Sequence, residues 1–173
     1  MANLENTNLE QGIFRNMTKN RLEGFSDGIL AVIITIMVLE LTIPHTINLN
    51  ELFHVLPDLL SYLLSFVVLA IFWINHHYLL HTLSHVTSKI IWANFHLLFW
   101  LSLIPFATGY MGKNSFHPYA VAFYAIILTI SSIAHNMLLH IIKSGFPRDS
   151  ALFIILKNLF QMLLIIEALI INF

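Results

Sequence analysis

Long apolar runs separated by short polar stretches dominate the chain, while residues 1–20 are polar. A helix that crosses a membrane needs about 20 mostly apolar residues. Five runs reach that length, and they predict the spans Phe25–Ile43, Leu52–Leu80, Ile90–Met111, Pro118–Ile142 and Ala151–Phe173. The pattern therefore predicts an all-α integral membrane protein, with one bundle of about five transmembrane helices over residues 21–173 and a polar cytoplasmic N-terminus before it.

Prolines and charges refine these spans. Pro44 follows the first span and predicts its end. No acidic or basic residue lies between Asp58 and Lys89, so the second span is long enough to tilt or to project beyond the hydrocarbon. Pro105 predicts a kink inside the third span, because proline removes a helical hydrogen bond that neighbouring groups must then satisfy.

Composition and charge exclude several classes of protein. The chain is 58% hydrophobic and only 10% charged, whereas a soluble domain carries roughly a quarter charged residues. A net charge of −1 offers no electrostatic attraction for nucleic acid. The chain has no cysteine, which excludes disulfides, thiol catalysis and cysteine metal sites.

Lysine and arginine are distributed unevenly between the two sides of the membrane. Most of them lie before the first span, between the second and third, or between the fourth and fifth: Arg15, Lys19, Arg21, Lys89, Lys143 and Arg148. In the loops on the opposite side, Lys113 is the only lysine or arginine. Because cytoplasmic loops carry the excess of positive residues, we expect a cytoplasmic N-terminus.

Asp27 lies within the first turns of an otherwise apolar helix. One interpretation is an interfacial acid that is favoured by the helix dipole. The other is a buried carboxylate bound by a partner from another helix, because a charge inside the bilayer is costly. The second span places four polar or aromatic candidates at the same membrane level: Trp73, Asn75, His76 and His77. An Asp27–His76 contact is therefore geometrically allowed, and such a contact would be sensitive to pH.

Histidines at one end of the second span raise a metal hypothesis. His77, His81 and His85 are spaced by four residues and share one helical face, a spacing that can bind zinc or iron. No carboxylate accompanies them, and His45, His54 and His117 lie apart. The pattern favours a structural or interfacial role over a metal site.

One side of the first span is apolar along its whole length. This stripe comprises Phe25, Gly28, Val32, Thr35, Ile36, Leu39 and Ile43. Stripes of this kind usually face lipid or pack against another helix, and the pattern alone does not predict a pore. Glu40 lies to one side of the stripe at its outer end, either as an interfacial acid or as a group that attracts cations to a mouth.

Three ordered motifs in successive spans are more specific. Arg21-x3-Phe25-Ser26-Asp27 opens the first, Trp73-x2-His76 closes the second, and Asn94 precedes Pro-Phe-x-Thr in the third. With their flanking residues from Arg21 to Gly112, they make the chain resemble the transmembrane protein 175 family, potassium channels of lysosomes and bacteria.

The resemblance implies a potassium-selective channel without a Thr-Val-Gly-Tyr-Gly filter, and this chain has no such sequence. In the family, single-repeat chains of six helices form tetramers whose pore is lined by the first helix. Carried over to this sequence, Val32 falls at the hydrophobic constriction. Thr35, Ile36 and Leu39 fall at the next pore-facing turns.

The resemblance also implies a network that holds the first helix in place. Its members in this sequence are Arg21, Phe25, Ser26, Asp27, Trp73, His76 and Asn94. We expect a homotetramer in the bilayer of a bacterial or archaeal plasma membrane, with potassium as the permeant ion, no cofactor or metal, and no enzymatic activity. Whether protons also pass is left open by the sequence.

Four features depart from the family pattern. Val32 is smaller than the usual Ile or Leu, Tyr78 replaces a frequent Arg, Thr87 replaces a frequent Asp, and the sixth helix is expected to be missing. These departures keep a non-conducting membrane subunit as the main alternative. A secondary transporter and a metal enzyme are further alternatives from other classes of protein.

Overall fold

The computed structural model describes residues 18–43 and 49–143, and the regular structure within them is helical. The helices are α2 (Lys19–Leu39), α3 (Leu49–His81), α4 (Ser88–Ser102), α5 (Ile104–Lys113) and α6 (Pro118–Lys143). In this part of the chain, four segments are long and apolar enough to cross a membrane, with α4 and α5 together forming one of them. The all-α membrane fold is thereby confirmed, and the predicted fifth span, Ala151–Phe173, lies outside the described residues.

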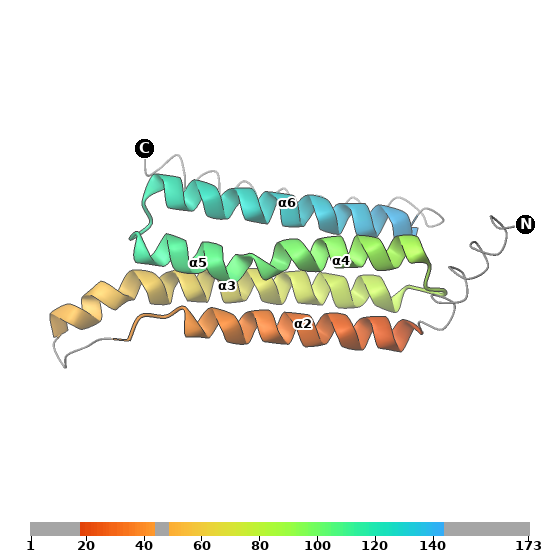
Figure 1. The fold of residues 1–173 in the computed structure, drawn as a ribbon, viewed down its shortest axis with the longest axis horizontal. Coiled ribbons are helices and arrows are strands. Elements are labelled where there is room, and N and C mark those ends of the chain that lie inside the picture. The colour runs from red at the N-terminus through yellow and green to blue at the C-terminus, as the bar shows by residue number, and fades with distance from the viewer. Residues whose placement is uncertain (1–17, 44–48, 144–173) are drawn as a thin grey trace, which may run out of the picture.

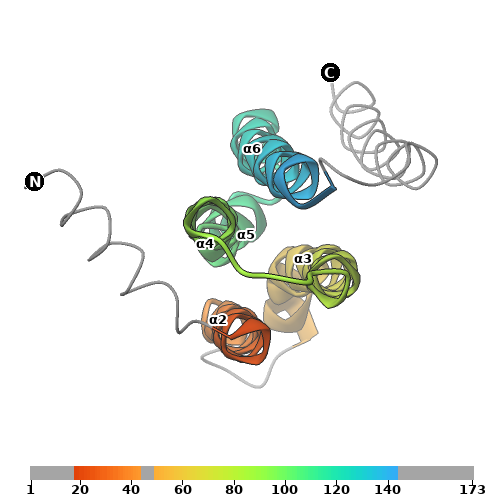
Figure 2. The same ribbon diagram turned by 90° about the vertical axis from the view of Figure 1, so that its right-hand side faces the viewer.

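The four segments lie side by side along the long axis of the molecule (Figure 1). Seen end-on, the α4–α5 segment lies between α2 and α6, with α3 beside it (Figure 2). α4 packs chiefly against α6, α5 packs chiefly against α3, and α2 contacts α3, α4 and α5. The third span is therefore the centre of the bundle, and α2 lies at its edge.

Capping residues explain why α2 is displaced from the predicted span Phe25–Ile43. The Thr18 hydroxyl accepts a hydrogen bond from the backbone N–H of Arg21, so the helix begins at Lys19 within a polar stretch. Glu40 caps the other end. Ile43 precedes a proline, which disfavours helical backbone at that position. Hydropathy alone records none of these effects.

The kink predicted in the third span is present as a one-residue break at Leu103, which separates α4 from α5. Pro105, at the second position of α5, has no N–H to donate to the preceding turn. The series of α-helical hydrogen bonds is interrupted at Leu103. Its N–H donates to the carbonyl of Trp100, three residues earlier, at 3.3 Å. α4 therefore ends at Ser102, and the next helix is free to take its own direction.

One face of α2 enters the apolar core. Leu22, Leu30, Ile33 and Met37 are each at most 3% exposed, and their successive spacings of eight, three and four residues place them on one stripe. They belong to a core cluster that includes leucines of all the other spans, namely Leu69, Leu97, Leu101 and Leu138. Burial on this face leaves the opposite face of α2 outside the bundle.

Close approach of α3 and α5 depends on a glycine, which gives the first prediction. A Cβ on Gly112 would lie 2.8 Å from the Asp58 Cα and 2.5 Å from the Ser61 Oγ. Gly112→Ala should therefore force these helices apart and lower the free energy of unfolding by about 1–3 kcal/mol. Thermal unfolding in detergent, followed by tryptophan fluorescence, measures this loss.

Gly24→Ala is the matched control, because nothing lies within 4 Å of a Cβ at that helical position. Alanine favours a helix over glycine by about 1 kcal/mol, so this variant should be as stable as the parent or slightly more stable. Equal stability of the two variants would contradict tight packing at Gly112.

Candidate functional site

All seven residues of the predicted stripe are exposed on the outside of the chain's own bundle. We call Phe25, Gly28, Val32, Thr35, Ile36, Leu39 and Ile43 the outward stripe. Val32 is 54% exposed and Leu39 is 80% exposed. The Thr35 hydroxyl donates to the Val32 carbonyl at 2.8 Å, so its oxygen keeps lone pairs that point away from the backbone. The stripe is a surface that a single copy of the chain leaves uncovered.

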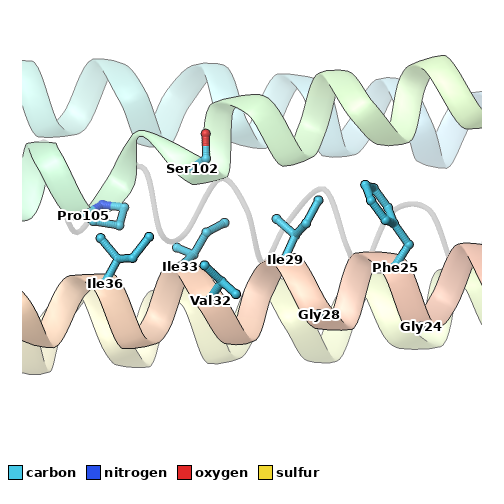
Figure 3. A pocket seen from close by; sticks show the side chains of 9 residues that line it. All are labelled: Gly24, Phe25, Gly28, Ile29, Val32, Ile33, Ile36, Ser102 and Pro105. Carbon is cyan, nitrogen blue, oxygen red and sulfur yellow. The ribbon is translucent and has the colours of Figure 1, made fainter.

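A groove of about 490 Å³ runs along the edge of this stripe. Gly24, Phe25, Gly28, Ile29, Val32, Ile33 and Ile36 of α2 line it on one side, and Ser102 and Pro105 line it on the other. Figure 3 shows Ile33 and Ile36 of α2 close to the break between α4 and α5, whereas Phe25 stands farther along α4. The groove is almost wholly apolar, and the break stands directly across it from the middle of α2.

The opposite face of α2 is tied to α4 and α3 by a buried hydrogen-bond chain. The Asn94 Nδ2 donates to the Ser26 Oγ at 2.9 Å, and the Asn94 Oδ1 lies 2.7 Å from the His76 Nε2. Because a carbonyl oxygen only accepts, the His76 Nε2 carries the proton. The Ser26 hydroxyl in turn donates to the Leu22 carbonyl at 2.9 Å. All three side chains are at most 1% exposed, so each bond forms away from solvent.

Asp27 binds Trp73 rather than His76. The Trp73 Nε1 donates to the Asp27 Oδ1 at 2.9 Å, from a position one turn before His76 on α3. His76 points into the core, whereas Asp27 lies at the half-exposed flank of α2. The allowed Asp27–His76 hydrogen bond is therefore replaced by two separate ones, and both hold the same stretch of α2.

The two remaining members of the predicted network behave differently from each other. Phe25 makes an edge contact with Phe95 of α4, with ring centroids 5.3 Å apart. Arg21 is exposed, and its guanidinium forms no hydrogen bond or ion pair with another described residue. Lys19 contacts α3 instead, donating from its Nζ to the His81 carbonyl at 2.6 Å. Within one copy, the structure thus bonds five of the seven residues to one another in two separate sets. Phe25 contacts Phe95 instead, and Arg21 lies apart.

The histidines of α3 pack as aromatic rings. His77 stacks on Trp73 with centroids 5.6 Å apart, and its ring centroid lies 6.3 Å from that of His81. Over residues 18–43 and 49–143, no three His, Asp or Glu side chains are grouped closely enough to hold a metal ion. The geometry therefore gives the metal hypothesis no support within these residues.

Two sets of polar contacts were not anticipated from the sequence. Thr108 donates to the Ser65 Oγ at 2.7 Å, and Ser65 donates to the Tyr124 hydroxyl at 2.9 Å, which links α5, α3 and α6. Glu40 at the end of α2 pairs with Lys113 of α5 at 3.0 Å. Ser61 and Ser65, spaced four residues apart in an apolar span, were the available signal for the first contact. No local signal pairs Glu40 with Lys113.

Comparisons with known proteins find similar chains in one family. The family model described as "Endosomal/lysosomal potassium channel TMEM175" matches residues 21–105. A potassium channel of Chryseobacterium sp. is 51% identical over 126 residues, which cover 73% of this chain and 66% of that protein. A potassium channel of Chamaesiphon minutus is 32% identical over 127 residues, 68% of this chain and 63% of that protein.

The fold also matches a solved channel. The crystal structure of a lysosomal potassium-selective channel TMEM175 homolog from Chamaesiphon minutus superposes with a TM-score of 0.76 at 27% identity, covering 89% of this chain and 86% of that one. The chain belongs to the TMEM175 family. Its aligned part spans slightly less than two thirds of the two potassium channels above.

The matched relatives are named as potassium channels, which are ion-transport proteins. Every residue of the predicted network, from Arg21 to Asn94, falls within the matched segment. The structure adds which of these side chains bond to one another. It thereby shows how a TMEM175 chain fixes one face of α2 and leaves the outward stripe uncovered.

Removal of the central amide tests the buried hydrogen-bond chain. Asn94→Leu leaves the His76 N–H without its acceptor and removes the donor to Ser26. Unpaired buried groups cost about 1–3 kcal/mol each. We therefore expect a marked loss of thermal stability in detergent. Asn20→Leu, the same substitution at an exposed position of α2, serves as the control and should leave the melting temperature nearly unchanged. Equal melting temperatures for the two variants would refute the structural role of this chain.

Proposed function

We propose that this protein is a homotetrameric, potassium-selective cation channel, with a pore lined by α2. The observation that carries the proposal is the division of α2 into two faces: buried hydrogen bonds hold one face, while the outward stripe stays uncovered in a chain of the TMEM175 family. A pore must be enclosed around its whole circumference, and the outward stripe of one chain can line only part of it. Copies related by rotational symmetry would complete it.

The chemistry of the stripe suits a hydrophobic constriction. Val32 is the proposed narrowest point, with Ile36 and Leu39 on the following turns. A ring of four such side chains excludes water when narrow and passes a hydrated ion only when it widens. No resident metal or cofactor is required, because potassium is the transported ion.

Thr35 supplies the polar element of the proposed pore. Its hydroxyl hydrogen is engaged by the Val32 carbonyl, so the oxygen is oriented as an acceptor. Four such oxygens would partly replace the water lost by a potassium ion at the constriction. Replacing Thr35 by the isosteric Val should therefore lower potassium flux severalfold, and unchanged flux would exclude this role.

The direction of the chain in the membrane follows from its charges. Lys19 and Arg21 belong to the first turn of α2, and Lys89 belongs to the first turn of α4. These two helices begin at the same end of the bundle (Figure 1). By the positive-inside rule this end faces the cytoplasm, in the plasma membrane of a prokaryotic cell. Asp27, Trp73 and His76 then lie near the cytoplasmic side, and Glu40 lies near the outer mouth.

The decisive experiment measures potassium and sodium flux into liposomes that contain the purified chain, with Val32→Asn beside it. An amide at the constriction should lower the dewetting barrier, raising flux or weakening the preference for potassium. Val38→Asn is the matched control, because Val38 is 44% exposed on the same helix but outside the stripe. It should behave like the parent.

The outcomes separate the candidate functions. An effect confined to Val32 supports a pore along α2, whereas equal behaviour of both variants would place Val32 against lipid. No flux from a folded oligomer would favour a non-conducting membrane subunit. Repeating the assay with a pH gradient as the sole driving force tests whether protons share the path.

A further inference from the structure

α2 is attached to the rest of the bundle at two separate places. Near its start, Ser26 and Asp27 bond to Asn94 of α4 and Trp73 of α3. Near its end, Glu40 pairs with Lys113 of α5. The outward residues Val32 and Ile36 lie between the two attachments. The helix that receives the outer attachment is thus different from those that receive the inner one.

The outer attachment combines an ion pair between Glu40 and Lys113 with close packing of Glu40 on α5. The Lys113 Nζ lies 3.0 Å from the Glu40 Oε2. One helical turn earlier, a Cβ on Gly109 would lie 2.9 Å from that same oxygen and 3.3 Å from the Glu40 Cβ. The Glu40 side chain therefore lies against the backbone of α5, and a methyl group at position 109 would displace its carboxylate. Thr108 also contacts Met37, with its Oγ1 3.8 Å from the sulfur.

The break before α5 makes this contact important, because it allows α5 to be oriented separately from α4. α4 ends at Ser102, and Pro105 interrupts the hydrogen bonds that would otherwise make α4 and α5 one rigid rod. Ser102 and Pro105 line the same groove as Val32, Ile33 and Ile36, and Figure 3 shows Pro105 next to Ile36. The inner half of α2 is bonded to elements before the break, and its outer end is bonded to the helix after it.

We propose that Glu40 and Lys113 are positioning residues, through which α5 sets the place of the outer half of α2. The inference rests on the channel function proposed above. Glu40 then acts as a mechanical attachment and not as a free charge that attracts cations, because its charge is paired within the same chain. An exposed ion pair contributes little to folding stability, so variants at these positions should still fold.

Neutralising each partner in turn distinguishes attachment from charge attraction. Glu40→Gln and Lys113→Gln both break the pair, so both should change potassium flux into liposomes in the same direction, by at least about twofold. If Glu40 instead attracts cations, loss of the acid should lower flux at low ionic strength, and loss of the base should raise it. Opposite effects would overturn the proposal.

Two further variants sharpen the test. The charge swap E40K together with K113E rebuilds the pair and should return flux toward the parent value, whereas a mouth whose charge matters would stay altered. Gly109→Ala keeps both charges but displaces the Glu40 side chain, so it should reproduce the effect of Glu40→Gln. Failure of the swap to rescue, or normal flux in Gly109→Ala, would overturn the attachment.

A readout without ion flux separates this proposal from the channel function. The chain contains no cysteine, so Val38→Cys gives a single site for a spin label on the last turn of α2. In the parent background the label should report a well-ordered helix. Glu40→Gln and Lys113→Gln should each increase its mobility, and the charge swap should reverse the change. Unaltered mobility would refute the attachment whether or not the parent conducts.

Discussion

The buried hydrogen bonds from Ser26 through Asn94 to His76 are the constraint on which the rest of the structure depends. In an apolar environment each polar group must find its partner inside the protein. One serine, one amide and one imidazole from three different helices satisfy each other, and they do so in only one register of those helices. Bonds between membrane helices contribute only about 0.6 kcal/mol each on average. Their contribution lies mainly in selecting which face of α2 turns inward.

Once that face is chosen, the outward face follows from helical geometry. Leu22, Ser26, Leu30, Ile33 and Met37 are buried, so the residues across the helix axis must lie outside. The sequence can therefore use apolar side chains on both faces of α2 without ambiguity. Hydrophobicity drives insertion into the membrane, and the few polar contacts decide rotation. Asp27 fits this account, because its bond to Trp73 acts on the same stretch of helix as Ser26.

Much of this architecture is readable from the sequence, and the remainder has a common physical origin. Apolar runs predict the four described spans because the bilayer demands length and hydropathy. Periodicity predicts the outward stripe, since 3.6 residues per turn determine which positions share a face. Helix ends depend on single caps such as Thr18, and the partner of Asp27 depends on side-chain reach across two helices. A hydropathy profile averages over many residues, so it predicts neither the helix ends nor the partner of Asp27.

The pair between Glu40 and Lys113 is the clearest case of what sequence patterns omit. Its members are 73 residues apart, and neither is unusual for a membrane interface. Only the packing of α2 on α5 at Gly109 brings them together. The Arg21 side chain shows the converse: membership in a recognisable motif does not predict a contact within one copy of the chain. It belongs to the most recognisable motif of the chain, yet within one copy it bonds to none of the other motif residues that are described.

A hydrophobic constriction makes such distant contacts important for ion passage. An apolar ring offers no ligand, so the barrier to an ion depends steeply on the width of the ring and on whether water fills it. At the proposed constriction, Val32 is shorter than leucine or isoleucine, so the width of the proposed ring would depend even more on the position of the α2 backbone. That position is determined by Asn94 and Trp73 at one end and by α5 at the other. The residues that govern permeation in such a pore therefore include side chains that never touch the ion.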